Sequence, residues 1–506
     1  MHNYSKVLAI LLVIIFLPAC VLFSRPVAST TMPTSPAKVV QSSSTPNTGP
    51  AELALTDTPF PRIVIDTRTP LPPTPLTPSD TPAPAGLNPS GPYILFKAPT
   101  GIWISNPDGS FLTQLSTSQV ATDLRLAISP KGDRLALVVQ NDQGLDLMQV
   151  KIPSGHTEKI AHLIDYTSQD ASDATSAKSF AAYAIRDYDS LAWQPGEGRL
   201  LAFMGAIKGP TSDLYVYNFQ TLKVTQLTNG PSQAVMPSWS PDGQYILHFG
   251  VSWVPPFGGA IIGANRLDGL WSVNASTGEV ITLPRPLGIN PNFAGWLDAA
   301  HFITYDSSEQ CFSQNLRGVD VVSGKATPIM SYSFYYQVVQ SPGNEALLFA
   351  GAPGCTNSLG DGIYLLPAGQ TKPYQLTGKR AYEVSWMPES KVFNAYPEAL
   401  FSSDGQTRYD PPVYDDSFHP AISKQGYQAW QIIQNQKGRV VVKVAAGDWQ
   451  TIATGLVDQL LWDPLQGKTL LIVMDDGTLY SAAFPDFTAV KMGKMDRAVS
   501  QAIWTP

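Results

Sequence analysis

The sequence predicts an all-β fold: a single β-propeller of eight or nine four-stranded blades, with an N-terminal signal and a disordered linker ahead of it. Three observations predict the propeller. A hairpin pattern recurs through most of the chain, at intervals of roughly 33 to 65 residues that bracket the length of one blade. A tryptophan stands at the same position of most copies, and the segments after each copy alternate between apolar and polar residues, as half-buried strands do.

Residues 234–249 form the clearest copy, because two apolar segments flank the turn sequence Ser240-Pro241-Asp242-Gly243. Proline presets the backbone angle of a turn, and aspartate accepts hydrogen bonds from nearby backbone N–H groups. Glycine adopts the positive φ that such turns require. The sequence therefore predicts two strands joined by a tight turn.

Six of the eleven tryptophans occupy the last position of the first strand in such copies. They are Trp193, Trp239, Trp296, Trp386, Trp462 and Trp504, and three further copies carry Ile128, Gln340 and Ile422 there. Each pair is followed by a third and usually a fourth strand-like segment, so every copy predicts one four-stranded antiparallel blade. We expect the tryptophans to pack between neighbouring blades.

These repeats resemble those of the TolB-like and WD-type propeller families, whose hallmark is Trp-Ser-Pro-Asp-Gly before an apolar strand. Residues 238–243 match the hallmark fully, and the other copies keep part of it. The resemblance extends over about residues 92–506 and implies the propeller fold. It implies little about activity, because propellers serve many functions.

The propeller domain, residues 92–506, is expected to close on itself. Residues 93–115 offer three strands with no inner strand before them, whereas the last segment, which ends on Trp504, is an inner strand with nothing after it. Pairing of the C-terminal with the N-terminal strands would complete one blade and remove two exposed sheet edges.

Residues 1–20 have the pattern of a secretory signal, with an apolar run over residues 7–17 that is too short to favour a spanning helix. The Leu-Pro-Ala-Cys sequence that ends on Cys20 resembles the bacterial lipobox. The resemblance implies a bacterial lipoprotein with a signal peptide at 1–20 and a lipid on Cys20. Such a protein is exported and anchored to the outer face of a bacterial membrane. An uncleaved anchor and ordinary signal-peptidase cleavage are the alternatives.

Residues 21–91 are rich in proline, threonine and serine and poor in aromatic residues. Such a segment buries too little apolar surface to offset the entropy of ordering, so a disordered linker is predicted. As a flexible coil it would span on the order of 45 Å and hold the propeller away from a membrane. A cleaved or passive tail is the alternative.

Composition argues against several classes of function. The net charge is −7 and basic residues form no cluster, so we expect no nucleic-acid partner. Six histidines and three cysteines offer little material for a metal centre. The motifs of zinc proteases, dithiol sites and serine hydrolases do not occur. We therefore predict no cofactor, no metal ligand and no catalytic residue.

Long inserts are expected on one face of the propeller, since they fall in loops between blades and in loops that join second and third strands. Loops on a rigid scaffold often carry binding sites. Candidate residues on this face are Trp253, Phe257 and Arg266, together with Tyr166 and Asp170. The alternative is neutral variation in loop length.

Acidic residues precede several inner strands and would surround the mouth of the central channel. They are Asp123, Asp189, Glu383, Asp416 and Asp458. Carboxylates at these positions could recruit a cation or a basic partner. Solvated side chains that cap backbone N–H groups are the alternative.

Cys311 and Cys355 are the cysteines that remain after the signal, and they occupy the same class of loop in successive blades. Because exported proteins meet an oxidising environment, a disulfide between them is predicted. Two thiols or a metal-binding pair are the alternatives.

Two functions remain open. The first is a membrane-anchored extracytoplasmic propeller that acts as a binding or scaffold module for a protein, peptide or glycan, with the membrane contacted through the N-terminal lipid. The alternative is a secreted propeller enzyme that acts on a polysaccharide or lactone through carboxylates at the channel mouth. We favour the binding module.

Overall fold

The computed structural model divides the chain into two compact units, Met1–Asp57 and Thr58–Pro506, and the residues that it describes belong to the second. They are residues 63–65, 86–118, 122–167, 170, 176–186, 188–254, 264–286, 292–308, 312–341, 345–355, 357–378, 383–387, 392–396, 399–402, 404–413, 416–443, 447–495 and 499–506. Within these ranges, no helix is long and apolar enough to cross a membrane.

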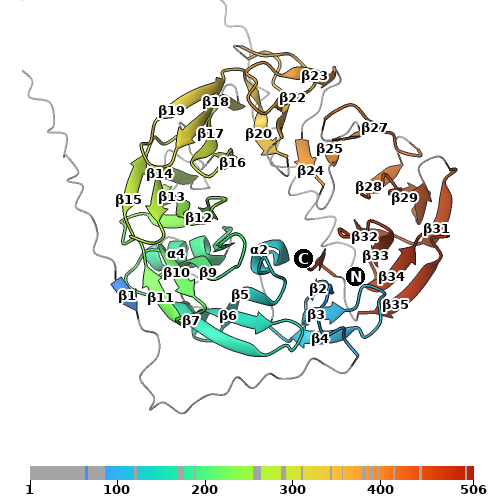
Figure 1. Cartoon of the computed structure of the whole chain (residues 1–506), viewed down its shortest axis with the longest axis horizontal. Coiled ribbons are helices and arrows are strands. Elements are labelled where there is room, and N and C mark those ends of the chain that lie inside the picture. Colours follow the sequence, from blue (N-terminus) through green and yellow to red (C-terminus); the bar gives the residue numbers. More distant parts are fainter. Residues whose placement is uncertain are drawn as a thin grey trace, which may run out of the picture. The chain divides into compact units, whose positions relative to one another are not determined.

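The described part is all-β, and its antiparallel sheets follow one another around a common centre in sequence order (Figure 1). One sheet combines the C-terminal strand β36 (Gln501–Trp504) with β2 (Ile94–Ala98), β3 (Gly101–Ser105) and β4 (Thr113–Ser116). The next contains β5 (Arg134–Asn141), β6 (Gly144–Lys151) and β7 (Thr157–Asp165). Two further sheets contain β8 (Leu191–Trp193), β9 (Leu200–Gly205), β10 (Asp213–Asn218) and β11 (Lys223–Gln226), and β12 (Gln233–Trp239), β13 (Tyr245–Val254), β14 (Ala264–Asn274) and β15 (Val280–Leu283).

The same pattern continues through the second half of the chain. Two sets of four strands join in one sheet. The first set contains β16 (Phe293–Trp296), β17 (His301–Ser308), β18 (Phe312–Asp320) and β19 (Ala326–Met330), and the second contains β20 (Phe334–Gln340), β21 (Ala346–Gly351), β22 (Ile363–Pro367) and β23 (Tyr374–Thr377). Three sheets follow: β24 (Glu383–Trp386), β25 (Val392–Tyr396), β26 (Ala399–Ser402) and β27 (Arg408–Tyr409); β28 (Ser417–Ile422), β29 (Gln428–Gln434), β30 (Lys437–Lys443) and β31 (Gln450–Thr454); β32 (Val457–Trp462), β33 (Thr469–Met474), β34 (Thr478–Ala483) and β35 (Ala489–Lys494).

The tryptophan register that the sequence predicts is confirmed. Each of the six tryptophans is the last residue of the first strand in its set, namely β8, β12, β16, β24, β32 and β36. Trp193, Trp239, Trp296, Trp462 and Trp504 are between 5 % and 9 % exposed, and each lies in an apolar cluster with other buried side chains.

Three of the indole N–H groups link one copy of the repeat to the copy before it. The bonds run from Trp193 Nε1 to the Ala127 carbonyl (2.9 Å), from Trp239 Nε1 to the Ala192 carbonyl (2.8 Å) and from Trp296 Nε1 to Ser238 Oγ (2.8 Å). In each case the acceptor residue directly precedes the register position of the preceding copy. The indole nitrogens of Trp386, Trp462 and Trp504 have no hydrogen-bond partner within the described part of the chain.

Apolar side chains gather between neighbouring sheets. Leu95 and Ile102 of one sheet share a cluster with Leu135 of the next. The last such cluster returns to the start of the described chain, because Leu471 of β33 packs with Phe96 of β2. β36 also pairs antiparallel with β2, with Trp504 opposite Ile94. The core is therefore spread over the contacts between sheets.

A short helix replaces an expected inner strand in the copy that carries Ile128. Helix α2 (Leu124–Ala127) precedes β5, and only an isolated bridge between Ile128 and Leu135 remains of the expected pairing. The Asp123 side chain caps the helix by accepting a hydrogen bond from the Arg125 N–H at 2.7 Å. The Leu-Arg-Leu-Ala sequence alternates like a strand, but all four residues are good helix formers and the aspartate is a favourable N-cap.

Three residues of the predicted disordered linker form a strand. Ile63–Ile65 are β1, which adds to β11 as a fifth antiparallel strand with Val64 opposite Thr225. Consecutive β-branched residues favour extended backbone, which explains why this part of the linker pairs. The predicted signal and the remaining linker residues before Gly86 lie outside the described residues.

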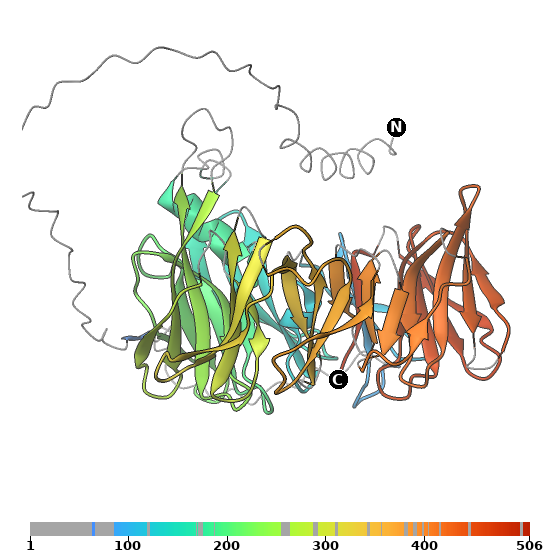
Figure 2. The same ribbon diagram turned by 90° about the horizontal axis from the view of Figure 1, so that it is seen from above.

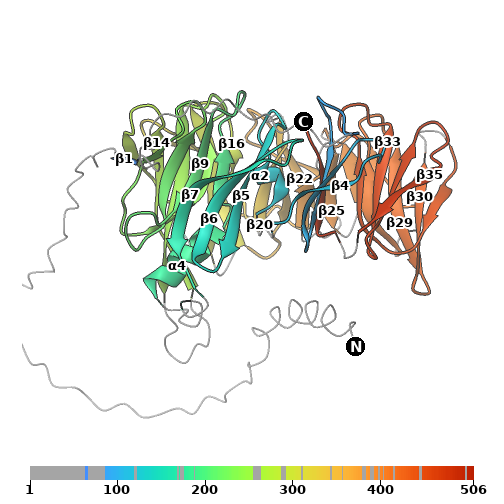
Figure 3. The ribbon, with the colours of Figure 1, turned by 90° about the horizontal axis from the view of Figure 1, so that it is seen from below.

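One face carries the larger insertions. Helix α4 (Ala177–Arg186) lies between β7 and β8 and buries Ala181, Ala182 and Ile185 in the core. The long hairpin of β13 and β14 rises on the same side as α4, as the sequence predicts (Figures 2 and 3). Tyr166, predicted to lie on this face, is instead only 8 % exposed and packs in the core.

Candidate functional site

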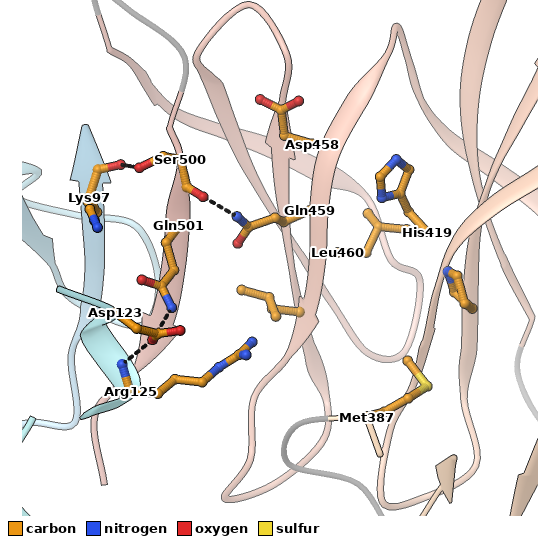
Figure 4. Close-up of a pocket in the computed structure, with 12 residues that line it drawn as sticks. Lys97, Asp123, Arg125, Met387, His419, Asp458, Gln459, Leu460, Ser500 and Gln501 are labelled. Carbon is orange, nitrogen blue, oxygen red and sulfur yellow. Dashed lines mark hydrogen bonds between the residues drawn. The ribbon is translucent and has the colours of Figure 1, made fainter. Parts of the chain in front are cut away.

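A cavity of about 550 Å³ lies among the inner strands, close to the place where β36 pairs with β2 (Figure 4). Its walls come from β2, α2, β28, β32 and β36, with one residue that follows β24. The lining residues are Lys97, Asp123, Arg125, Met387, His419, Pro420, Asp458, Gln459, Leu460, Leu461, Ser500 and Gln501. This volume is in the range of small-ligand sites.

Two glutamines fix the wall where the sheets meet. Gln501 Nε2 donates to Asp123 Oδ1 at 2.6 Å, and Gln501 Oε1 accepts from the Leu124 N–H at 2.9 Å. Gln459 Nε2 donates to the Ser500 carbonyl at 3.2 Å, and its Oε1 accepts from the Ala502 N–H at 2.9 Å. Each amide therefore uses both ends to join two parts of the chain, so this wall is held rigidly.

Lys97 and Asp123 are charged residues already engaged with their neighbours. Lys97 Nζ donates to the Thr122 carbonyl at 2.9 Å. Burial lowers the pKa of Lys97, although the nearby negative charge of Asp123 opposes this shift. Asp123 accepts hydrogen bonds from Gln501 and from the Arg125 N–H. Neither charge needs a ligand to satisfy it.

Arg125 differs from these residues. It is exposed on α2, and its side chain extends into the cavity (Figure 4). Its guanidinium makes no hydrogen bond or ion pair with another described residue. A guanidinium carries five donors in a fixed planar arrangement that matches a carboxylate or phosphate. Arg125 can therefore offer these donors to a ligand.

The opposite wall is partly apolar. Met387, Pro420, Leu460 and Leu461 line it. His419 stands beside them, and burial lowers its pKa while the charge of Asp458 opposes that shift. The neutral imidazole that this shift favours and the aliphatic side chains together offer a surface suited to an uncharged, aliphatic part of a ligand.

A second cavity of about 580 Å³ also includes Arg125 in its lining. Asp189, Trp193 and Trp239 lie along it. Burial raises the pKa of Asp189, and the negative charge of Asp123 adds to the shift. Arg125 thus stands where the two hollows adjoin, with carboxylates on both sides of its helix.

The structure brings together part of the acidic set that the sequence predicts. Asp123 and Asp458 line the same cavity, and Asp189 lies within electrostatic reach of Asp123. Asp416 is not among the lining residues, and its carboxylate accepts a hydrogen bond from Gln434 Nε2 at 3.0 Å. Glu383 is the first residue of β24, and its side chain lies outside the described part.

Of the predicted loop residues, Arg266 is described in full and is not part of the lining of this cavity. Arg266 is exposed, and its Nε donates to Asp268 at 3.1 Å. Trp253 pairs with Asn265 across the long hairpin, while its side chain and all of Phe257 fall outside the described residues. Cys355 is half-buried after β21, but Cys311 and Cys20 lie outside the described residues. The disulfide and the lipid site stay predictions.

Sequence reasoning missed the basic and apolar side of the cavity. Lys97, Arg125, His419 and Met387 come from four different sheets or their connections, and no motif joins them. The position of His419, two residues into an inner strand, was the available signal. Within the described ranges, no group of three or more histidine, cysteine, aspartate or glutamate residues is placed to hold a metal ion.

The described part of the chain is an all-β protein with many four-stranded antiparallel sheets and a ligand-sized cavity among its inner strands. No family model and no curated protein matches the chain. Among solved structures it is similar to dipeptidyl peptidase 4 of Porphyromonas gingivalis, at 10 % identity and a TM-score of 0.46, over 74 % of this chain and 60 % of that one. This chain thus spans less than two thirds of the peptidase.

Two other solved structures are similar at a lower level. TolB from Acinetobacter baumannii matches at 12 % identity and a TM-score of 0.25, over 74 % of this chain and 82 % of TolB. Oligogalacturonate lyase from Vibrio parahaemolyticus matches at 12 % identity and a TM-score of 0.33, over 59 % and 75 %. TM-scores below 0.5 carry no conclusion about activity, so function is inferred from the residues of the cavity.

Proposed function

We propose that the chain is a membrane-anchored extracytoplasmic binding protein that holds a protein, peptide or glycan partner at the cavity around Arg125. The observation that carries this proposal is the arginine itself. Its guanidinium extends into a rigid, ligand-sized hollow without a partner among the described residues, whereas Asp123 and Lys97 are engaged. A polar group fixed in a mostly preformed cavity is typical of a binding site.

The proposed anchor is a lipid on Cys20, and the linker would hold the sheets away from the membrane surface. The lipobox-like sequence before Cys20 supports the anchor, and the proline-rich composition after it supports the spacing. We also propose that nine sets of strands, eight with four strands and one with three, close into a propeller. Support comes from the β36–β2 pairing and from the apolar clusters between consecutive sets.

Partner capture tests this function. The full chain, displayed on its native envelope, would be the bait, and His419→Ala and Arg125→Ala would alter the cavity. Arg199→Ala is the matched control, because Arg199 is exposed and lies outside the cavity lining. We expect the two cavity variants to lose a specific partner that the control retains. Equal capture by all three variants would contradict the proposal.

The alternative, a polysaccharide- or lactone-acting enzyme, predicts a different result. Asp123 and Asp458 share the cavity, so carboxylate chemistry there can be tested directly. Turnover of a polysaccharide that is lost in both Asp123→Asn and Asp458→Asn would assign the cavity to catalysis. Metal analysis of the purified chain complements this test, because some such enzymes need a bound metal.

A further inference from the structure

The cavity has the chemistry to distinguish between kinds of partner, and this inference rests on the proposed binding function. We propose that its ligand is the C-terminal end of a peptide chain. The terminal carboxylate would bind the Arg125 guanidinium, and an aliphatic last side chain would lie against Met387, Leu460 and Leu461.

The carboxylate follows from the hydrogen-bond donors that Arg125 leaves unused in the cavity. The Arg125 guanidinium makes no hydrogen bond or ion pair with another described residue. Lys97 donates to the Thr122 carbonyl, and Asp123 is bonded by Gln501. A planar guanidinium binds a carboxylate through two parallel hydrogen bonds, which gives orientation as well as affinity.

The aliphatic side chain follows from the opposite wall. Met387, Pro420, Leu460 and Leu461 line it, and the cavity lining contains no tryptophan, tyrosine or phenylalanine. The C–H face of a sugar ring packs best on a flat aromatic ring, which this wall does not supply. Methionine and leucine suit an aliphatic side chain, and methionine adapts to different shapes. The wall therefore favours a peptide over a glycan.

Polar groups along the wall suit the backbone of a peptide. Gln459 and Gln501 also line the cavity, but their amides already form hydrogen bonds with neighbouring parts of the chain. Asp458 and His419 both line the cavity, on the neighbouring strands β32 and β28. The His419 imidazole would meet a backbone group of a preceding residue. A chain end that enters the hollow with its carboxylate first fits this order of groups.

The probes are N-acetylated pentapeptides that end in alanine, valine, leucine, isoleucine, methionine or phenylalanine, each as the free acid and as the C-terminal amide. Their binding to the full chain would be measured by fluorescence polarisation. We expect at least one free acid with an aliphatic end to bind roughly 10- to 100-fold more tightly than its amide, the range for hydrogen bonds to a charged group.

Arg125→Ala should remove this acid-over-amide preference, Arg125→Lys should keep part of it, and Arg199→Ala should keep all of it. Equal unfolding transitions for the four proteins would show that folding is unaffected. A preference that persists in Arg125→Ala, or the absence of any preference across the six pairs, would overturn the proposal. An oligosaccharide of uronic acids that binds through Arg125 where the peptides do not would overturn it in favour of a glycan.

The same measurements separate this inference from the proposed function. If cavity variants lose the native partner but no peptide shows an acid preference, only the peptide end is wrong. If capture of the native partner does not depend on the cavity, the binding function proposed for it fails as well.

Discussion

Replacement of Trp239 by phenylalanine tests the hydrogen bonds that join successive sheets. Trp239 is 5 % exposed, and its Nε1 donates to the Ala192 carbonyl of the preceding sheet at 2.8 Å. Phenylalanine keeps an aromatic ring but removes the donor, so the half-buried Ala192 carbonyl loses this partner. The control is Trp462→Phe, because Trp462 is also 5 % exposed and its indole nitrogen has no partner among the described residues.

The expected magnitudes follow from that difference. Loss of a typical hydrogen bond to a half-buried acceptor costs about 0.5–1.5 kcal/mol. Trp462→Phe removes an indole N–H that has no such bond, so its cost comes from lost packing against Tyr427 and Phe487 alone. Trp239→Phe should therefore be the more destabilising by about 1 kcal/mol. Trp239→Ala, which empties the space, should cost about 3–5 kcal/mol.

Urea denaturation of the full chain, followed by circular dichroism, provides the measurement. A protein of this size need not unfold in a single step, so midpoints of the same transition should be compared. The reasoning is refuted if the two phenylalanine variants unfold at the same midpoint. It is also refuted if Trp239→Ala leaves the transition unchanged.

Three further predictions concern pH, chain closure and the cysteines. Burial raises the pKa of Asp213 from 3.8 to about 6, although hydrogen bonds from Gly230 and Thr228 oppose the shift; the native state thus holds the proton more tightly than the unfolded chain. The contribution of Asp213 to stability is present below about pH 4 and falls by roughly 3 kcal/mol as pH rises through 6. Asp213→Asn should therefore flatten the fall in urea midpoint between pH 4.5 and 7.5. An unchanged dependence of the midpoint on pH would contradict this role of Asp213. Deletion of residues 499–506 removes β36 from β2 and should cause aggregation in size-exclusion chromatography; a monomer with unchanged unfolding would rule the pairing out. Thiol titration of the protein purified without reductant should find Cys311 and Cys355 oxidised to a disulfide worth roughly 4 kcal/mol, whereas two reactive thiols would show that they are not bonded.

The strands and the tryptophan register could be predicted because both depend on local pattern. Alternating residues define strands, and Ser-Pro-Asp-Gly defines a turn: Ser240 Oγ accepts from the Tyr245 N–H at 2.9 Å, and Gly243 has a φ of +69°. Chain order then places each tryptophan at the end of an inner strand. These signals repeat, so an error in one copy is corrected by the others.

Local exceptions to the pattern could not be predicted in the same way. Helix α2 arises where an alternating sequence is also a good helix former, and the Asp123 cap decides between the two. Strand β1 has three residues, too few for an alternation to be recognised. In both places competing local preferences are similar in size, so one helix cap or one neighbouring strand selects the outcome.

The cavity itself lay beyond sequence reasoning for a different reason. Asp458 could be predicted because the sequence places carboxylates at the start of several inner strands. Arg125 could not, because its side chain reaches the cavity only through helix α2. Met387 and His419 join it from other sheets. Their proximity depends on how many sheets separate them around the centre, and that number is not a property of any one repeat.

Site-specific photo-crosslinking tests the central claim, that the cavity around Arg125 receives the partner. A photoreactive amino acid would be placed at Met387 on the cavity wall and, as a control, at Val490 on β35, which is 59 % exposed. We expect irradiation of the native envelope to give a specific adduct from position 387 that disappears in the Arg125→Ala background, and none from position 490. The claim is contradicted if the adduct forms at position 490 alone, or if the adduct at 387 persists without Arg125.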